Sequence, residues 1–176
     1  YCPFKGPRSL RGSIQAGVGA GLAGLVLWLG LLTPFVHADG ASSWSFQGFF
    51  LRLLSAGLVV PLFEELMMRG FVFRLALQWD QARTTGDKEP LHTALDRRSV
   101  NDVAPGAWPW PAVMLSTLAF TSGHAVAEWP AAIAYGLLMA WLWVSRKDLV
   151  ACITAHAVTN IALALFVYTT GNWHYW

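Results

Sequence analysis

The chain has 176 residues, of which 55% are hydrophobic and only 12% are charged, whereas an average soluble domain is roughly 25% charged. Its net charge of +2 is too small to indicate nucleic-acid binding. Ten tryptophans and ten phenylalanines are the aromatic excess expected at membrane interfaces. The composition therefore excludes a soluble domain and predicts an all-α fold, a polytopic transmembrane helical bundle with one folded unit over residues 1–176.

Two cysteines, Cys2 and Cys152, lie far apart and form no ligand pair, so the sequence predicts neither a disulfide framework nor a thiolate metal site. The chain begins at Tyr1 rather than Met. The presence of further helices upstream is therefore an open question.

Five stretches are apolar enough to be spanning helices, which need about 20 mostly apolar residues. They run approximately over Ser13–Val36, Phe46–Trp79, Trp108–Glu128, Ala131–Val144 and Leu149–Tyr168. The second is too long for one perpendicular span, so we expect its last turns to project into water, and the fourth is short enough to cross only in part. Gly17 and Gly21 have the small-xxx-small spacing that suits close helix packing, within one chain or between chains.

One hydrophilic segment, at about residues 80–107, mixes both charges with Gly and Pro and is typical of an exposed loop. Basic residues occur in three clusters: Lys5, Arg8 and Arg11; Arg83, Lys88, Arg97 and Arg98; Arg146 and Lys147. All three fall on one side of the membrane if the chain spans five times, and the excess of Lys and Arg predicts that this side is the cytoplasm.

Charged residues interrupt the second apolar stretch at FEELMMRGF, residues 63–71. Glu65 and Arg69 are four residues apart, so they share a helix face and can pair. Glu64 lies about 100° around the helix and points elsewhere. We therefore expect one neutralised carboxylate and one free to react, although an interfacial charge cluster would have the same spacing.

Two further polar motifs lie in the third and fifth stretches. FTSGH places Phe120 and His124 one turn apart, and HAVTN places His156 and Asn160 on one face. An interfacial histidine and a hydrogen bond between helices are the simpler interpretations. However, four polar side chains fall at similar depths from one membrane face: those of Glu64, His124, His156 and Asn160. This predicts a shared, water-containing cavity, which we expect to open toward the cytoplasm.

A carboxylate and imidazoles around water suit peptide hydrolysis. Glu64 could remove a proton from a water held between it and His124. His156 and Asn160 could donate hydrogen bonds to the oxyanion that forms at a peptide carbonyl. Thr121 and Ser122 lie nearby, but no Ser–His–Asp arrangement is evident, which disfavours a serine protease.

The three motifs resemble those of the CAAX protease and bacteriocin-processing family, also called the ABI family. EELMMR matches EExxxR, FTSGH matches FxxxH and HAVTN matches HxxxN, in the family's order and on separate predicted helices. The resemblance implies an intramembrane endopeptidase similar to the type II CAAX prenyl endopeptidase, with a membrane-associated protein or peptide as substrate and no nucleic-acid partner. It implies that Glu64 and His124 activate water, that His156 and Asn160 stabilise the oxyanion, and that supporting residues hold the site together: Glu65, Arg69 and Phe120.

Several alternatives are open at this point. Glu64, His124 and His156 could supply a His₂Glu zinc set, although the expected mechanism needs no cofactor and HExxH is absent. A non-catalytic role, as a bacteriocin self-immunity factor or a scaffold, would preserve the same motifs. A proton-coupled transporter is disfavoured because no repeated or interrupted paired segments occur. The expected location is a bacterial inner membrane.

Overall fold

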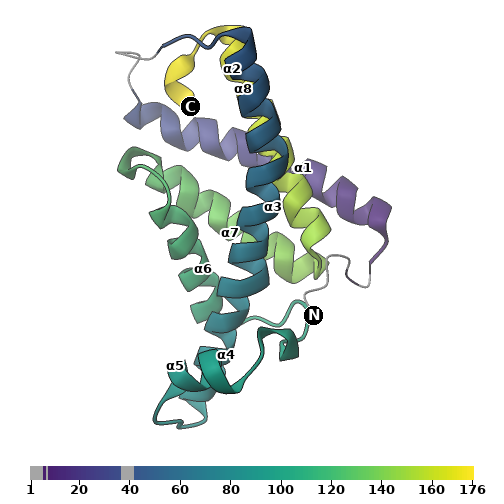
Figure 1. Cartoon of the computed structure of the whole chain (residues 1–176), viewed down its shortest axis with the longest axis vertical. Helices are drawn as coiled ribbons and strands as arrows, with labels where there is room; N and C mark the ends of the chain where they lie inside the picture. Colours follow the sequence, from purple (N-terminus) through teal and green to yellow (C-terminus); the bar gives the residue numbers. More distant parts are fainter. Residues whose placement is uncertain (1–5, 7, 37–41) are drawn as a thin grey trace.

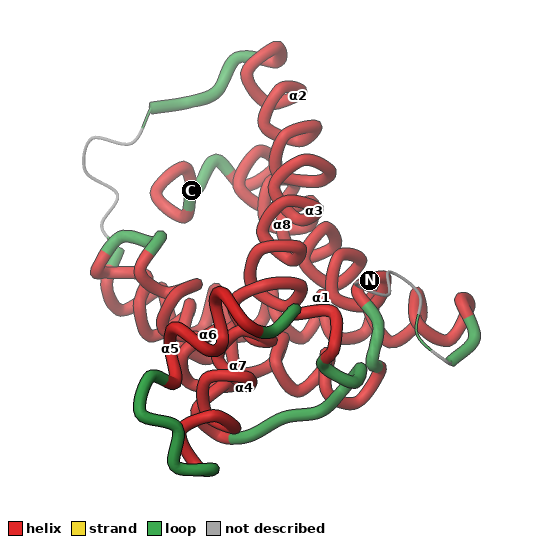
Figure 2. Tube along the Cα trace, turned by 60° about the horizontal axis from the view of Figure 1, so that its bottom comes forward, coloured by secondary structure: helices red, strands yellow, loops and turns green. Residues whose placement is uncertain are grey.

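The computed structural model describes residue 6, residues 8–36 and residues 42–176. Cys2, Lys5 and the first part of the loop at residues 37–45 lie outside the described residues. Within them all regular structure is helical, so the predicted all-α class is confirmed (Figure 2). The helices longer than eight residues, and α3, are α1 (Leu10–Leu32), α2 (Phe46–Leu54), α3 (Val60–Glu65), α4 (Phe73–Thr84), α6 (Trp110–Ser122), α7 (Trp129–Arg146) and α8 (Leu149–Thr170).

A single helical column runs through α2, α3 and α4 from Phe46 to Thr84, and it stands nearly vertical in Figure 1. Two wider, π-helical turns join its parts, at Ser55–Val59 and at Leu66–Val72. Pro61 explains the first of these, because it has no N–H to donate to the carbonyl four residues earlier. The second contains Arg69, and π-turns of this kind are common at functional sites.

Close contact between α1 and α8 forms the centre of the bundle. A Cβ atom added at Gly21 would lie 2.5 Å from the carbonyl oxygen of Ala155, and one added at Gly17 would lie 2.7 Å from that of Ala151. The small-xxx-small pair of α1 therefore packs within the chain, where only a glycine leaves room for the neighbouring backbone. The buried core also includes Trp143 of α7.

The third expected span is shorter than predicted. We expected a helix to about Glu128, but α6 ends at Ser122, followed by Gly123 and a turn to α7. At 1.5 Å per residue its 13 residues reach only about 20 Å, less than the roughly 30 Å of a hydrocarbon core. Glu128 stabilises the turn, because its Oε2 accepts a hydrogen bond of 2.9 Å from the N–H of Ala125.

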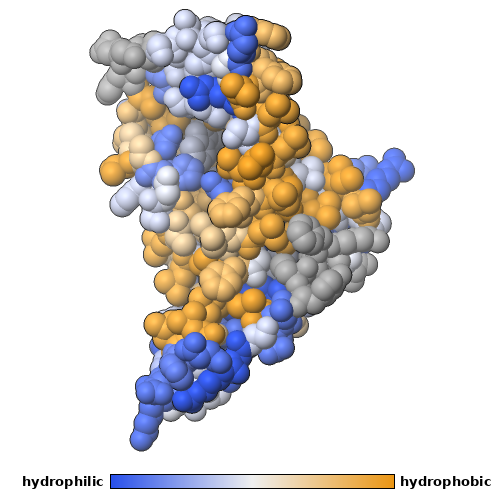
Figure 3. Space-filling view, in the orientation of Figure 1, coloured by the Kyte–Doolittle hydropathy of each residue, from blue (hydrophilic) through white to orange (hydrophobic). Residues whose placement is uncertain are grey.

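Three helical segments of the described chain are long and apolar enough to cross a membrane: Leu10–Phe35, Phe46–Thr84 and Leu149–Thr170. An apolar band covers the middle of the molecule in Figure 3, with hydrophilic surfaces at its bottom and top. These observations identify an integral membrane protein. The full crossing of α6 and α7, and hence the count of five spans, stays a prediction.

Candidate active site

The two adjacent glutamates of α3 have opposite environments. Glu65 is fully buried, whereas the side chain of Glu64 is 35% exposed and lines a cavity. Their positions follow from the 100° step between successive helical residues. One carboxylate is therefore enclosed by protein and the other is accessible from the cavity, as the sequence predicted.

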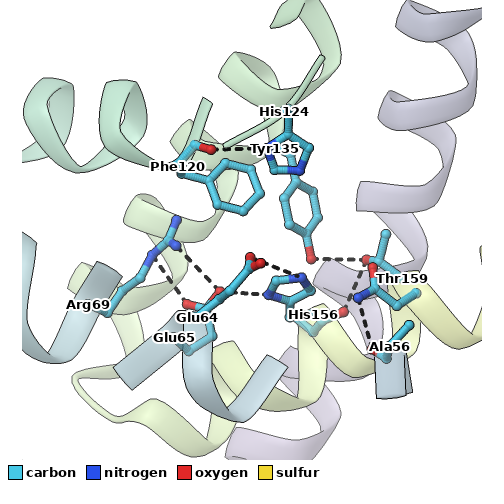
Figure 4. A network of polar contacts seen from close by, with 11 residues as sticks. Ala56, Glu64, Glu65, Arg69, Phe120, His124, Tyr135, His156 and Thr159 are labelled. Carbon is cyan, nitrogen blue, oxygen red and sulfur yellow. Dashed lines mark hydrogen bonds and ion pairs between the residues drawn. The ribbon is translucent and has the colours of Figure 1, made fainter. Parts of the chain in front are cut away.

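Glu65 forms a buried ion pair with Arg69, and both side chains are 0% exposed. Arg69 Nε lies 3.3 Å from Glu65 Oε2, and Arg69 Nη2 donates a hydrogen bond to the carbonyl oxygen of Gly136 at 3.2 Å. It also lies over the ring of Phe120, 5.8 Å from the centroid. The expected pairing, drawn in Figure 4, is confirmed. The contacts of Arg69 with Phe120 and Gly136 connect this pair to α6 and α7.

His156 of α8 lies between the two glutamates. Its Nδ1 is 2.9 Å from Glu65 Oε1, and its Nε2 is 3.9 Å from Glu64 Oε2. An Nδ1–H that donates to Glu65 fixes the ring, so that Nε2 is directed at Glu64 and the cavity. Asn160, one turn further along α8, donates from Nδ2 to the carbonyl oxygen of Ala56 at 2.9 Å. This bond uses one of its two amide hydrogens and leaves the other for a ligand.

His124 reaches the same cavity from the opposite wall, just beyond the end of α6. Its Nδ1 lies 3.0 Å from the carbonyl oxygen of Phe120, and its ring packs against Phe120 and Trp28 at centroid distances of 4.6 and 5.3 Å. A proton on Nδ1 would be held by that carbonyl and would leave Nε2 able to accept a proton or bind water. The indole of Trp129 fixes the turn by donating to the carbonyl oxygen of His124 at 3.2 Å.

The cavity measures about 230 Å³ and brings together all four residues expected to be catalytic. They come from three separate elements: α3, the turn after α6, and α8. A water occupies about 30 Å³ of liquid volume, so the space holds several waters or a peptide group with one. Its walls are completed by mostly apolar side chains, among them Trp28, Val60, Tyr135, Leu163, Tyr175 and Trp176.

The donor atoms around the cavity do not match the alternative zinc set. Among the residues that the structure describes, no three His, Cys, Asp or Glu side chains converge so as to hold one metal ion. Glu64, His124 and His156 line the cavity without forming such a set. Thr121 and Ser122 donate their hydroxyls to carbonyls of their own helix, at 2.9 and 2.8 Å. Neither forms a nucleophile–histidine pair.

Sequence reasoning missed two buried residues that support His156. The hydroxyl of Tyr135 donates to Thr159 Oγ1 at 3.2 Å, and Thr159 donates in turn to the carbonyl oxygen of Gly21 at 2.8 Å. The ring of Tyr135 lies edge-on to His156 at 5.8 Å. Thr159 could have been identified because it directly precedes Asn160 of the HxxxN motif. Tyr135 could not, because a tyrosine in an apolar helix does not by itself indicate a functional site.

The cavity lies beside the end of the chain rather than beside the basic clusters. Its lining includes Tyr175 and Trp176 near the end of the chain, and Glu128 before α7, but none of the residues of the three basic clusters. The membrane side on which the cavity opens stays a prediction. Spacing along single helices indicates depth in the membrane but not which helix ends flank a cavity.

Comparison with known families gives one match. The family model described as type II CAAX prenyl endopeptidase Rce1-like matches residues 46–162. This range contains every residue of the three motifs and the whole column from α2 to α4. No curated protein and no solved structure matches the chain.

Proposed function

The chain belongs to the type II CAAX prenyl endopeptidase Rce1-like family of intramembrane proteases, and on this premise we propose that it hydrolyses a peptide bond of a membrane-associated protein or peptide in a bacterial inner membrane. The observation that carries the proposal is the unequal environment of two adjacent carboxylates. Glu65 is held by Arg69 and His156, whereas Glu64 faces a cavity that also contains His124 and Asn160.

In the proposed first step, Glu64 and His124 hold a water beside the scissile carbonyl. Glu64 accepts a proton from this water as its oxygen forms a bond to the carbonyl carbon. The carbonyl oxygen becomes an oxyanion, which accepts hydrogen bonds from His156 Nε2–H and from the free amide hydrogen of Asn160. Donation from Nε2 requires the doubly protonated ring, whose second proton is bound to Nδ1 and donated to Glu65.

In the second step, the tetrahedral intermediate collapses and the carbon–nitrogen bond breaks. The proton on Glu64 passes to the leaving amine, so that the carboxylate is regenerated. Arg69 and Glu65 keep their buried positions throughout, and we assign them to positioning His156 rather than to the reacting atoms. Nothing in this sequence of steps requires a cofactor.

The test compares membrane proteomes of cells with the wild-type protein and with Glu64→Gln, after chemical labelling of protein termini and mass spectrometry. Glu64→Gln keeps the size of the side chain and removes the base. Glu89→Gln is the matched control, because Glu89 lies in the exposed loop and its side chain is 65% exposed. Termini that occur with wild type and Glu89→Gln, but not with Glu64→Gln, would establish proteolysis and identify the substrate.

Identical termini in all three samples, with equal amounts of folded protein, would contradict the proposal. That result would favour the non-catalytic alternative, a self-immunity factor or scaffold, whose binding does not depend on a base at Glu64.

A further inference from the structure

Basic side chains gather at one end of the molecule, which we call the basic end. Arg146, at the end of α7, donates from Nη2 to Ser13 near the start of α1 at 3.2 Å. Gly6 and Gly106 both pack against Lys147, so the beginning of the chain and the loop after α4 meet there. The basic end contains eight of the 12 Lys and Arg residues: Arg8, Arg11, Arg83, Lys88, Arg97, Arg98, Arg146 and Lys147.

Aromatic side chains gather at the opposite end, which we call the aromatic end. Trp44 lies 5.4 Å from both Trp173 and Trp176 between ring centroids. The hydroxyls of Thr33 and Tyr175 are 2.9 Å apart, so the ends of α1 and of the chain are joined. Arg52, over the ring of Trp44 at 4.8 Å, is the basic residue found here among the described residues. In Figure 1 this end lies at the top and the loop after α4 at the bottom.

The cavity belongs to the aromatic end. Trp28 lines it from the last turns of α1, four residues before Leu32. Tyr175 and Trp176 line it from the end of the chain, and Glu128 from the turn before α7. Glu64 lies near the middle of the Phe46–Thr84 column and His156 lies within α8, whereas the lining residues closest to helix ends belong to the aromatic end.

We infer that the cavity opens on the extracytoplasmic side of the membrane, and that it takes a peptide bond in the outer half of an exported, membrane-anchored protein. Short loops rich in Lys and Arg remain in the cytoplasm, which places the basic end there and the aromatic end on the opposite side. Among the described residues, eight basic residues at one end against one at the other strongly favour a cytoplasmic location of the basic end. The loop between α4 and α6 is short enough for this charge rule to apply. The substrate class rests on the proposed proteolysis, whereas the direction of the opening does not.

The direction of opening is tested by the reactivity of single cysteines with a charged, membrane-impermeant methanethiosulfonate reagent. The background is Cys2→Ser, with Cys152 retained because it is fully buried. Thr170→Cys marks the aromatic end, and Lys88→Cys marks the basic end. Leu163→Cys probes the cavity, and the adjacent Ala164→Cys is its control, because Ala164 is 0% exposed and does not line the cavity.

Each variant is treated in spheroplasts and in inside-out vesicles. We expect Thr170→Cys and Leu163→Cys to react at least about tenfold faster in spheroplasts, because a charged reagent does not cross the hydrocarbon core. Lys88→Cys should show the reverse preference, and Ala164→Cys should stay unmodified in both. Faster reaction of Leu163→Cys in inside-out vesicles would overturn the inference, and so would equal rates for Leu163→Cys and Ala164→Cys.

The same measurements in the Glu64→Gln background separate this inference from the proposed function. We expect an unchanged labelling pattern, because direction of opening does not depend on catalysis. Outward labelling together with the absence of specific new termini would refute proteolysis and leave the orientation standing. Inward labelling together with specific new termini would refute the outward orientation and leave proteolysis standing.

Discussion

Adding one methyl group at Gly21 should destabilise the protein, whereas adding it at Gly19 should not. At Gly21 a Cβ would lie 2.5 Å from the Ala155 carbonyl oxygen and 2.7 Å from Val158 Cβ, but at Gly19 no atom lies within 4 Å. Overpacking costs about 1–3 kcal/mol, and replacing a helical glycine by alanine gains about 0.5–1 kcal/mol. Gly19→Ala should therefore raise the free energy of unfolding slightly, and Gly21→Ala should lower it by about 1–2 kcal/mol on balance.

The assay is thermal unfolding of each purified variant in detergent, followed by tryptophan fluorescence. The contact also predicts an effect on activity, because Thr159 donates a hydrogen bond to the carbonyl of Gly21 and lies on the same helix as His156. Gly21→Ala should therefore reduce cleavage and Gly19→Ala should leave it unchanged. Equal midpoints for the two variants, or a higher midpoint for Gly21→Ala, would refute the described packing of α1 on α8.

Three further predictions concern the site. Arg69→Met should lower the free energy of unfolding by about 3–5 kcal/mol, because it removes the guanidinium that neutralises the buried Glu65 carboxylate. Arg83→Met, which replaces a side chain that is 54% exposed, should cost at most about 1 kcal/mol; equal thermal midpoints for the two variants would contradict this. Tyr135→Phe should cost about 1 kcal/mol through the lost hydrogen bond, and no change in midpoint would argue against the bond. Cleavage in isolated membranes should persist in excess chelator; loss on chelation and recovery with zinc would replace the proposed mechanism by a metal-dependent one.

Helix positions and the residues of the candidate site could be predicted from the sequence because both depend on local spacing. Apolar length located all five helical regions, and the four-residue intervals of the motifs indicated which side chains share a face. The ion pair of Glu65 with Arg69 was predictable for the same reason, since both residues lie on one helix.

Contacts between helices were less accessible from sequence. Glu65 also pairs with His156, 91 positions later, and no local pattern encodes that distance. The early end of α6 at Ser122 was missed because hydropathy continues through the following turn. The position of the opening depends on how α1 and the end of the chain flank the cavity, which spacing along single helices does not determine.

The role of Glu64 as the base of a peptide hydrolysis in this cavity can be measured as a rate. The measurement is the rate at which the wild-type-specific termini appear in isolated membranes containing Glu64→Gln or Glu89→Gln protein at equal abundance. We expect a rate at least about 10²-fold below wild type for Glu64→Gln, the usual size of a general-base contribution, and a wild-type rate for Glu89→Gln. A rate for Glu64→Gln within a few-fold of wild type would contradict this role.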